Sequence, residues 1–257
     1  MKQLLKRAFA PVWEYYRDLR PRNITSKKYN HLLLILYWPF FGFLFLAVER
    51  LFPIWFDMTY HPIICAADQY IPFHEIFVIP YYYWFAFLIV PGVYFCLWEP
   101  RAFRDFQWAI ILTYSVTIII YFIYPTEQNL RPDPADLARD NLLTRITLGL
   151  YNFDTNTNVC PSIHVLGSFA TLFAGLHSKT LAGWKWKLFF ILSTVLISMS
   201  TVFLKQHSLI DVIAAFGVGF CCYAVQFWLY PVLEKHWLAR KAAGQAAVPP
   251  VPDKKGD

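Results

Sequence analysis

The segment Ile76–Trp98 reads IFVIPYYYWFAFLIVPGVYFCLW and carries no acidic or basic side chain over its 23 residues. About 20 mainly apolar residues suffice for a helix to cross the hydrocarbon core of a bilayer, so this segment predicts a membrane-spanning helix. Five further segments also lack Asp, Glu, Lys and Arg, namely His31–Val48, Phe106–Tyr124, Val159–Ser178, Leu188–Leu204 and Val212–Leu233. The sequence therefore predicts an all-α fold, a polytopic membrane protein built as a six-transmembrane-helix bundle.

The composition excludes several other classes of protein. Hydrophobic residues make up 57% of the 257 residues and charged residues only 16%, whereas soluble domains average roughly 25% charged residues. An ordinary soluble domain and a disordered chain are therefore both excluded. Five cysteines without a Cys-x-x-Cys pair also exclude a small disulfide-stapled domain and a zinc ribbon.

Basic residues predict the orientation of the chain in the membrane. With both termini in the cytoplasm, the cytoplasmic pieces hold 18 of the 23 Lys and Arg residues, and such an excess is typical of that side. We therefore expect a basic cytoplasmic segment (1–30), a six-span membrane domain (31–233) and a flexible cytoplasmic tail (234–257). The net charge of +6 follows mainly from this asymmetry, so the expected partner is the lipid bilayer and not a nucleic acid. The oligomeric state stays open.

Three polar clusters lie where predicted spans begin or end, and all three fall on the non-cytoplasmic face. The first is Tyr124–Pro132, after the third span, and the second is Cys160–His164, at the start of the fourth. The third is Lys205–Asp211, between the fifth span and the sixth. Ionisable residues at the edge of a membrane span are candidates for function. Their convergence on one face predicts a single site there.

The third cluster places His207 and Asp211 four residues apart. At this spacing both side chains lie on one face of a helix. A carboxylate that accepts a hydrogen bond from one imidazole nitrogen fixes the tautomer and leaves the other nitrogen as a base or nucleophile. The spacing also fits a helix cap, with Asp211 at the start of the sixth span and His207 in a loop.

The other two clusters contain groups that bind anions. Pro161 is typical of the first turn of a helix, and the free N–H groups of such a turn, together with the hydroxyl of Ser162, favour an anion. His164 falls in the same turn, and the guanidinium of Arg131 suits phosphate oxygens. Taken singly, His164 also fits an interfacial residue without chemistry, and Arg131 a loop arginine paired with a nearby Asp. Together these groups predict phosphoryl transfer, which depends mainly on positioning and charge stabilisation.

Two alternatives involve other chemistry. His164, His207 and Asp211 belong to residue types that also ligate zinc. Cys65 and Cys160 both fall on the non-cytoplasmic side, where an oxidising compartment would allow them to pair. The anion-binding groups beside the two histidines favour phosphate over zinc.

With these motifs the sequence resembles the type-2 phosphatidate phosphatase superfamily, which shares its site with vanadium haloperoxidases. The three motifs of that family are Lys-x6-Arg-Pro, Pro-Ser-x-His and Ser-Arg-x5-His-x3-Asp. The chain contains, in the same order, Arg131-Pro132, Pro161-Ser162-Ile163-His164, and Ser200 followed by His207 and Asp211. The motifs cover roughly residues 106–233, and the layout of the spans resembles the integral-membrane lipid phosphatase branch.

The resemblance implies a role for each motif residue. His207 is the nucleophile that forms a phosphohistidine, Asp211 orients it, and His164 protonates the leaving alkoxide. Arg131 and Ser162 hold phosphate oxygens. This scheme implies no metal or other cofactor, and its substrate is a membrane lipid phosphate that is reached on the non-cytoplasmic face. Residues 31–233 would then form a catalytic domain.

The chain departs from the family pattern at two cationic positions. Tyr124 stands in place of the lysine of the first motif, and Thr201 in place of the arginine of the third. Lys205 is our candidate for one replacement charge among the phosphate-binding residues, and Arg139 or Arg145 for another. Similar losses occur in related lipid phosphotransferases such as sphingomyelin and inositol phosphorylceramide synthases.

These departures leave three functions to compare. The first expectation is a phosphatase that hydrolyses a lipid phosphomonoester or pyrophosphate, the second a lipid head-group phosphotransferase, and the third a binding or scaffold protein without catalysis. The lipid stays open among phosphatidate, phosphatidylglycerol phosphate, a polyprenyl pyrophosphate and a sphingolipid phosphate.

Overall fold

The computed structural model describes residues 2–137 and 139–246, and most of them are helical. The α-helices are α1 (Lys2–Tyr16), α2 (Tyr37–Leu46), α3 (Phe52–Trp55), α4 (Val78–Trp98), α5 (Pro100–Ile123), α6 (Leu142–Phe153), α7 (Ile163–His177), α8 (Trp184–Phe203), α9 (Leu209–Ala224) and α10 (Tyr230–Ala246). In this part of the chain the strands are limited to one short parallel pair, β1 (His61–Pro62) and β2 (Thr126–Glu127). The predicted all-α class is therefore confirmed.

Five stretches of helix in the described residues are long and apolar enough to cross a membrane, namely Asn30–Trp55, Glu75–Trp98, Pro100–Ile123, Trp184–Phe203 and Leu209–Arg240. They correspond to the first, second, third, fifth and sixth predicted spans. Their outward faces are apolar, as a lipid solvent requires; Phe43 of α2 and Ile123 of α5, for example, are 65% and 73% exposed. The chain is an integral membrane protein built as a polytopic helical bundle.

The fourth predicted span, Val159–Ser178, is wrong in its extent. The helix there is α7, whose 15 residues reach about 22 Å at 1.5 Å per residue, less than the roughly 30 Å of a hydrocarbon core. Residues 159–162 are not helical, because they form the polar loop from which α7 starts. A short helix is tolerated here because α7 is enclosed by protein: Val165 and Leu166 are fully buried.

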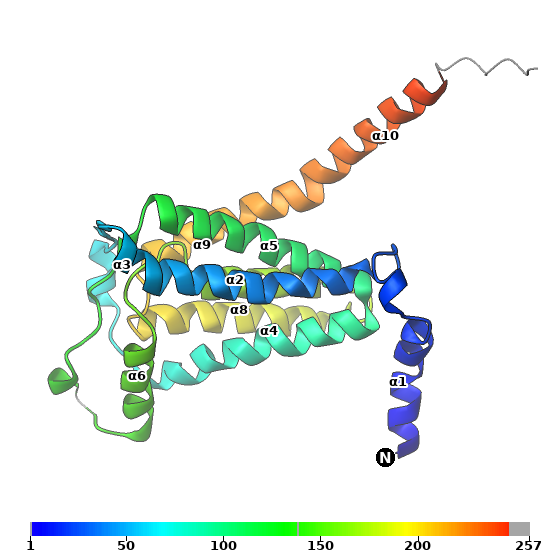
Figure 1. Cartoon of the computed structure of the whole chain (residues 1–257). Helices are drawn as coiled ribbons and strands as arrows, with labels where there is room; N and C mark the ends of the chain where they lie inside the picture. Colours follow the sequence, from blue (N-terminus) through cyan, green and yellow to red (C-terminus); the bar gives the residue numbers. More distant parts are fainter. Residues whose placement is uncertain (1, 138, 247–257) are drawn as a thin grey trace, which may run out of the picture.

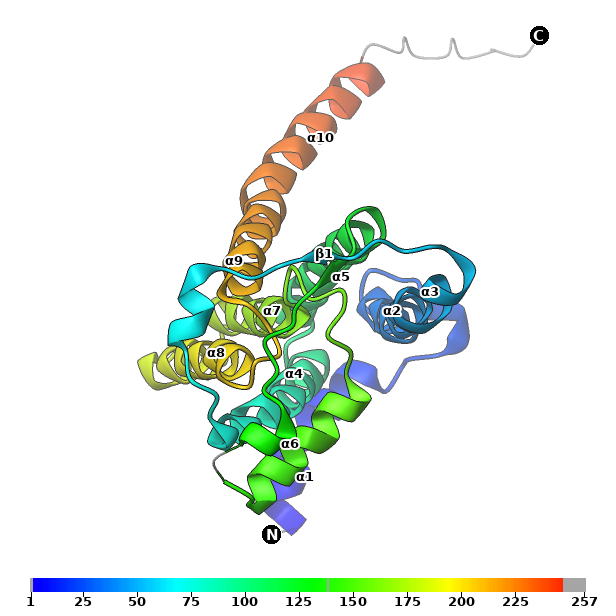
Figure 2. The ribbon, with the colours of Figure 1, turned by 90° about the vertical axis from the view of Figure 1, so that its left-hand side faces the viewer.

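The helix α7 lies at the centre of the bundle and packs against α4, α5, α8 and α9. Figure 2, which views the bundle end-on, places α7 among these helices, with α2 further out beside α5. In Figure 1 the helices of the bundle run side by side, α6 lies across one end, and α1 lies at the opposite end. The loops that carry the polar clusters gather at the end where α6 lies.

The sequence predicts a flexible carboxyl-terminal segment from residue 234. In the structure α10 continues the last span as helix through Ala246, after one π-helical turn at Val225–Leu229. This helix projects away from the bundle (Figure 1). The rest of the expected tail, residues 247–257, lies outside the described residues.

Candidate active site

The three polar clusters are joined to one another by two buried side chains of the first cluster. The hydroxyl of Thr126 accepts hydrogen bonds from the main-chain N–H groups of Val159 and Cys160, at 3.1 and 3.2 Å. The amide of Gln128 donates to the main-chain oxygens of Lys205 and Gln206 in the third cluster. The convergence that the sequence predicts is therefore realised, since three loops far apart in the chain form one structure.

The histidine and the aspartate of the third cluster form a buried pair. Nδ1 of His207 lies 3.2 Å from Oδ2 of Asp211, and both residues are at least 95% buried. The same oxygen accepts from the main-chain N–H of Ser208, the residue at which α9 is capped. His207 lies in the loop before α9, so the helix-cap alternative is the one that the structure has, and Asp211 serves both as a cap and as the partner of His207. Its carboxylate favours the tautomer with the proton on Nδ1, which leaves the lone pair on Nε2.

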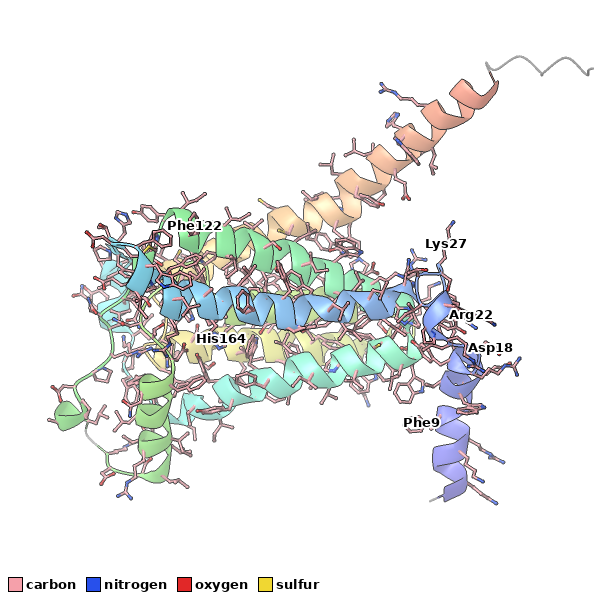
Figure 3. All side chains as sticks on the ribbon, in the orientation of Figure 1. Phe9, Asp18, Arg22, Lys27, Phe122 and His164 are labelled. Carbon is pink, nitrogen blue, oxygen red and sulfur yellow. The ribbon has the colours of Figure 1, made fainter. Side chains whose placement is uncertain are left out.

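The second histidine faces the first. The ring centroid of His164 lies 5.8 Å from that of His207, and its ring is held between Tyr81 and Trp84 of α4 at 4.5 and 4.4 Å. His164 is in the first turn of α7, next to Ser162, at which this helix begins. Figure 3 labels His164 inside the bundle. The structure therefore brings both histidines to one place.

A small polar cavity contains both imidazole rings. Gln206, Asn158 and Asp154 contribute to its lining. Next to it, buried polar atoms lack a hydrogen-bond partner, including Oγ of Ser162, Nδ1 of His164 and Nε2 of Gln206. Leaving such an atom unpaired costs about 1–3 kcal/mol, and natural proteins seldom accept this cost without a ligand or water. These unpaired atoms offer contacts to a ligand with several oxygen atoms, but the cavity of about 20 Å³ has room for about one water and must widen to admit such a ligand.

Arg131 lies at the site, where its side chain holds the surrounding loops together by hydrogen bonds. Its guanidinium donates to the main-chain oxygens of Tyr151, Asp154 and Thr155, and Nη2 donates to the side-chain oxygen of Gln206 at 2.6 Å. Burial lowers the pKa of Arg131 below its ordinary value, and the nearby Asp154 opposes that effect. Of its nitrogens only Nε lacks a partner. A phosphate contact of Arg131 stays a prediction. In this geometry only Nε is free to make it.

Lys205 is buried in the third cluster, but its ammonium is directed elsewhere. Nζ donates to the main-chain oxygen of Asp68 at 2.8 Å, and Lys205 is absent from the lining of the cavity. Burial lowers its pKa, an effect that Asp68 opposes. Its expected role as a phosphate ligand stays a prediction without a contact to support it.

Among the residues that the structure describes, no Lys or Arg lines the cavity in place of the two missing family cations. Tyr124 stacks on His61 at 4.1 Å, and the hydroxyl of Thr201 is bonded inside α8 to the oxygen of Ser198. The other candidate charges are paired elsewhere, with Arg139 bound to Glu75 and Arg145 to Asp140. The cavity wall therefore carries less positive charge than it would with the lysine and arginine of the family motifs.

Asp68 is a site residue that the sequence did not reveal. From the loop between the first two spans, its carboxylate accepts hydrogen bonds from the hydroxyl of Ser208 at 2.6 Å and from the N–H groups of Leu209 and Cys65. Burial acts to raise the pKa of Asp68, but these hydrogen bonds outweigh it and the net pKa is lowered. Asp68 has no motif, so only the fold identifies it.

Glu49 is a second missed residue. Its carboxylate is buried and accepts hydrogen bonds from the hydroxyls of Thr155 and Thr157, which line the cavity. A signal for it exists in the sequence, because Glu49 directly follows the predicted end of the first span at Val48. The criterion of an ionisable residue at the edge of a span also selects it.

The zinc and disulfide alternatives find no geometry to support them. Across residues 2–137 and 139–246, no three His, Cys, Asp or Glu side chains are grouped so as to hold a metal ion. Cys65 and Cys160 are both free thiols.

The fold and the site together define a polytopic membrane protein with a buried two-histidine centre. A family model described as the PAP2 superfamily matches residues 108–235, about half of the chain, and this stretch includes all three motifs. The chain belongs to the PAP2 superfamily, which includes lipid phosphatases and related enzymes. Neither the curated proteins nor the solved structures contain a match to it.

Proposed function

We propose that the protein is a lipid phosphate phosphatase that hydrolyses a phosphomonoester or pyrophosphate through a phosphohistidine. The observation that carries the proposal is the pairing of His207 with Asp211 opposite His164, on a cavity flanked by the unpartnered hydroxyl of Ser162. Membership of the PAP2 superfamily supports phosphatase-type hydrolysis.

The reaction proceeds in two steps. In the first, Nε2 of His207 attacks phosphorus, the bond from phosphorus to the lipid oxygen breaks, and His164 gives a proton to the departing alkoxide. In the second, water loses a proton to His164 and attacks phosphorus, the bond to Nε2 breaks, and phosphate leaves. Asp211 stabilises the positive charge that develops on the imidazole in each step.

The phosphate oxygens are held by neutral donors more than by cations in this proposal. In this proposal the hydroxyl of Ser162, which has no partner, and the N–H groups of the first turn of α7 bind one phosphate. The side-chain amide of Gln206 adds a donor, since Nε2 has no partner while its oxygen is occupied by Arg131.

The proposed site lies on the non-cytoplasmic face. The basic segment 1–30 contains α1, which lies at the end of the bundle opposite α6 and the loops of the site (Figure 1). Placing α1 in the cytoplasm, as the distribution of Lys and Arg favours, puts the site on the other face. The substrate then stays in the bilayer and presents its head group at the interface.

A specific observation favours a second candidate, a lipid head-group phosphotransferase. Tyr124 and Thr201 replace two family cations, and Lys205 is bonded to Asp68 instead. In this alternative the donor is a phosphodiester lipid. The first step breaks the bond from phosphorus to the lipid oxygen and leaves the phospho-head group on His207. In the second step an alcohol replaces water, so that the product is a new phospholipid.

The test is phosphate release by the purified full-length protein in detergent micelles, without added metal, from a panel of lipid phosphates. His207→Ala removes the proposed nucleophile. His177→Ala is the matched control, because His177 is exposed at the far end of α7 and bonds to Phe173 of its own helix.

We expect release that persists in His177→Ala and vanishes in His207→Ala. Release that is equal in both variants would overturn the proposal. If no phosphate is released but mass spectrometry finds a new phospholipid once an acceptor alcohol is added, the transferase is the correct function.

A further inference from the structure

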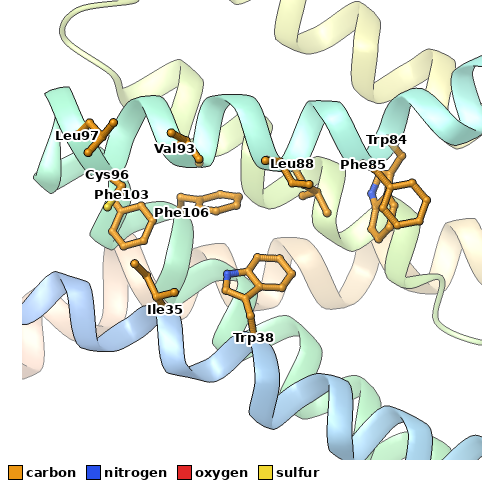
Figure 4. Close-up of a pocket in the computed structure, with 12 residues that line it drawn as sticks. Ile35, Trp38, Trp84, Phe85, Leu88, Val93, Cys96, Leu97, Phe103 and Phe106 are labelled. Carbon is orange, nitrogen blue, oxygen red and sulfur yellow. The ribbon is translucent and has the colours of Figure 1, made fainter. Parts of the chain in front are cut away.

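A large apolar groove opens between the first two spans and shares no lining residue with the polar cavity. One wall is α4 from Trp84 to Leu97, the facing wall includes Trp38 of α2, and Phe103 and Phe106 of α5 complete the lining (Figure 4). Its volume is about 650 Å³. The wall on α4 extends for roughly 20 Å at 1.5 Å per residue.

The groove suits a hydrocarbon chain and no polar ligand. Its lining consists of aliphatic and aromatic side chains with one thiol, Cys96. The indole N–H of Trp38 is already bonded to Gln107, whereas that of Trp84 is buried without a partner at the end of the groove next to His164. Such a lining leaves apolar burial as the source of affinity.

One end of the groove reaches the proposed active site. Trp84 lines the groove, and its ring centroid is 4.4 Å from that of His164. His164 in turn faces His207 across the polar cavity. A single side chain, Trp84, therefore separates the groove from the residue that would protonate the leaving group.

The chemistry of the leaving group connects the two features. The oxygen that receives the proton from His164 is the oxygen to which the lipid is attached. The lipid must therefore leave the cavity on the side of His164, which is where the groove begins. A bulk lipid of the membrane receives no proton from His164, so this chemistry gives it no reason to lie at this end of the groove.

We infer that this groove holds one hydrocarbon chain of the lipid phosphate substrate, which runs from His164 past Trp84 along α4 towards Leu97. The substrate class is thus a phosphate ester with a chain long enough to occupy the groove, and any further chain stays in the bilayer. The inference rests on the proposed function, because it uses the role of His164 as proton donor.

The test measures kcat/KM of the full-length protein for hexyl, decyl and hexadecyl phosphate in the same micelles. Val93→Trp fills the groove from α4, at a residue that is 51% exposed. Val195→Trp is the matched control, because Val195 is 48% exposed on α8 and lies outside the groove.

We expect the wild-type value to rise with chain length. Val93→Trp should lower it for hexadecyl phosphate by about tenfold, the size of effect that a changed apolar pocket produces, and leave hexyl phosphate unchanged. Val195→Trp should match the wild type. Activity on hexyl phosphate also shows that the variant is folded; if Val93→Trp lacks it, Ile89→Trp on the same wall replaces it.

Two results overturn the inference in distinguishable ways. If Val93→Trp keeps the wild-type dependence on chain length, the chain lies elsewhere and the groove holds bulk lipid. If the wild-type protein releases phosphate neither from these three compounds nor from any member of the lipid phosphate panel, the proposed function fails, and the assignment of the groove fails with it.

Discussion

Asp68 and Ser208 are 140 residues apart in the chain, and a hydrogen bond of 2.6 Å joins the carboxylate of the first to the hydroxyl of the second. Ser208 follows His207 directly, and Leu209, the first residue of α9, donates its N–H to the other oxygen of Asp68. A loop outside the PAP2-matched region therefore holds the proposed nucleophile in place.

Asp68→Asn should loosen this loop. An amide offers one acceptor oxygen where the carboxylate serves three donors, so we expect a loss of stability of about 1.5–3 kcal/mol and a lower kcat. Asp57→Asn, in the same inter-span loop but exposed, is the control and should behave as the wild type. Thermal unfolding and turnover measure the two effects.

The stabilising effect of Asp68 should depend on pH, and Asp68→Asn provides the comparison. The pKa of Asp68 is lowered in the folded protein, so its stabilising effect is complete above the unfolded pKa of about 3.9 and is lost as the pH falls through the folded value. The difference in unfolding free energy between wild type and Asp68→Asn should be constant near neutrality and shrink in acid. A difference that grows in acid would contradict the assignment.

Ser162→Ala should separate binding from stability. The hydroxyl of Ser162 is buried without a partner in the free protein, so its removal should leave the melting temperature unchanged or slightly higher. We expect KM for the lipid phosphate to rise by about tenfold, the value of one hydrogen bond to a charged group. Ser198→Ala, which loses only a bond inside α8, should leave KM unchanged. A fall in melting temperature with no change in KM would show a structural role.

Arg131→Lys tests whether this arginine braces the loops or binds phosphate. A lysine cannot reproduce the four hydrogen bonds of the guanidinium to Tyr151, Asp154, Thr155 and Gln206. We expect lower thermal stability together with lower kcat. The control Arg145→Lys alters an exposed pair with Asp140 and should change little. Wild-type stability with a raised KM would instead identify Arg131 as a direct phosphate ligand.

Gly167→Ala tests how tightly α7 packs against its neighbours. A Cβ atom at Gly167 would lie 2.5 Å from the hydroxyl oxygen of Tyr114 and 3.2 Å from Nε1 of Trp84, so we expect a destabilisation of about 1–3 kcal/mol. Gly217→Ala is the control, because nothing lies within 4 Å of the added atom. It should be neutral or stabilising by up to about 1 kcal/mol. Equal melting temperatures for the two variants would contradict the packing.

The sequence predicts the parts of the site whose geometry is local. The spacing of His207 and Asp211 predicts their contact, which joins the loop before α9 to the first turn of that helix, and Ser162 and His164 share the start of another helix. Apolar runs predict five of the spans for the same reason, since each is decided by its own residues. The fourth is misjudged because neighbouring helices, and not its own length, decide how α7 is placed.

The parts that depend on tertiary contacts escape prediction. The position of Lys205 in the sequence suggests a phosphate ligand, yet its ammonium donates a hydrogen bond to the main-chain oxygen of Asp68. Arg131 is found by its motif, but the four acceptors that occupy it come from two other segments of the chain, residues 151–155 and Gln206. Hydrogen bonds of this kind become visible only when the loops are folded together.

The central claim is that His207 carries the phosphoryl group. The most direct measurement is mass spectrometry of the protein after rapid quenching with a lipid phosphate, under alkaline conditions in which phosphohistidine is preserved. Asp211→Asn, which weakens the orientation of His207, should slow formation of the phosphoenzyme by about 10²- to 10⁴-fold. We predict phosphate on His207 alone, absent from His207→Ala. Turnover without any phosphorylated His207, or phosphate found on His164 instead, would contradict this claim.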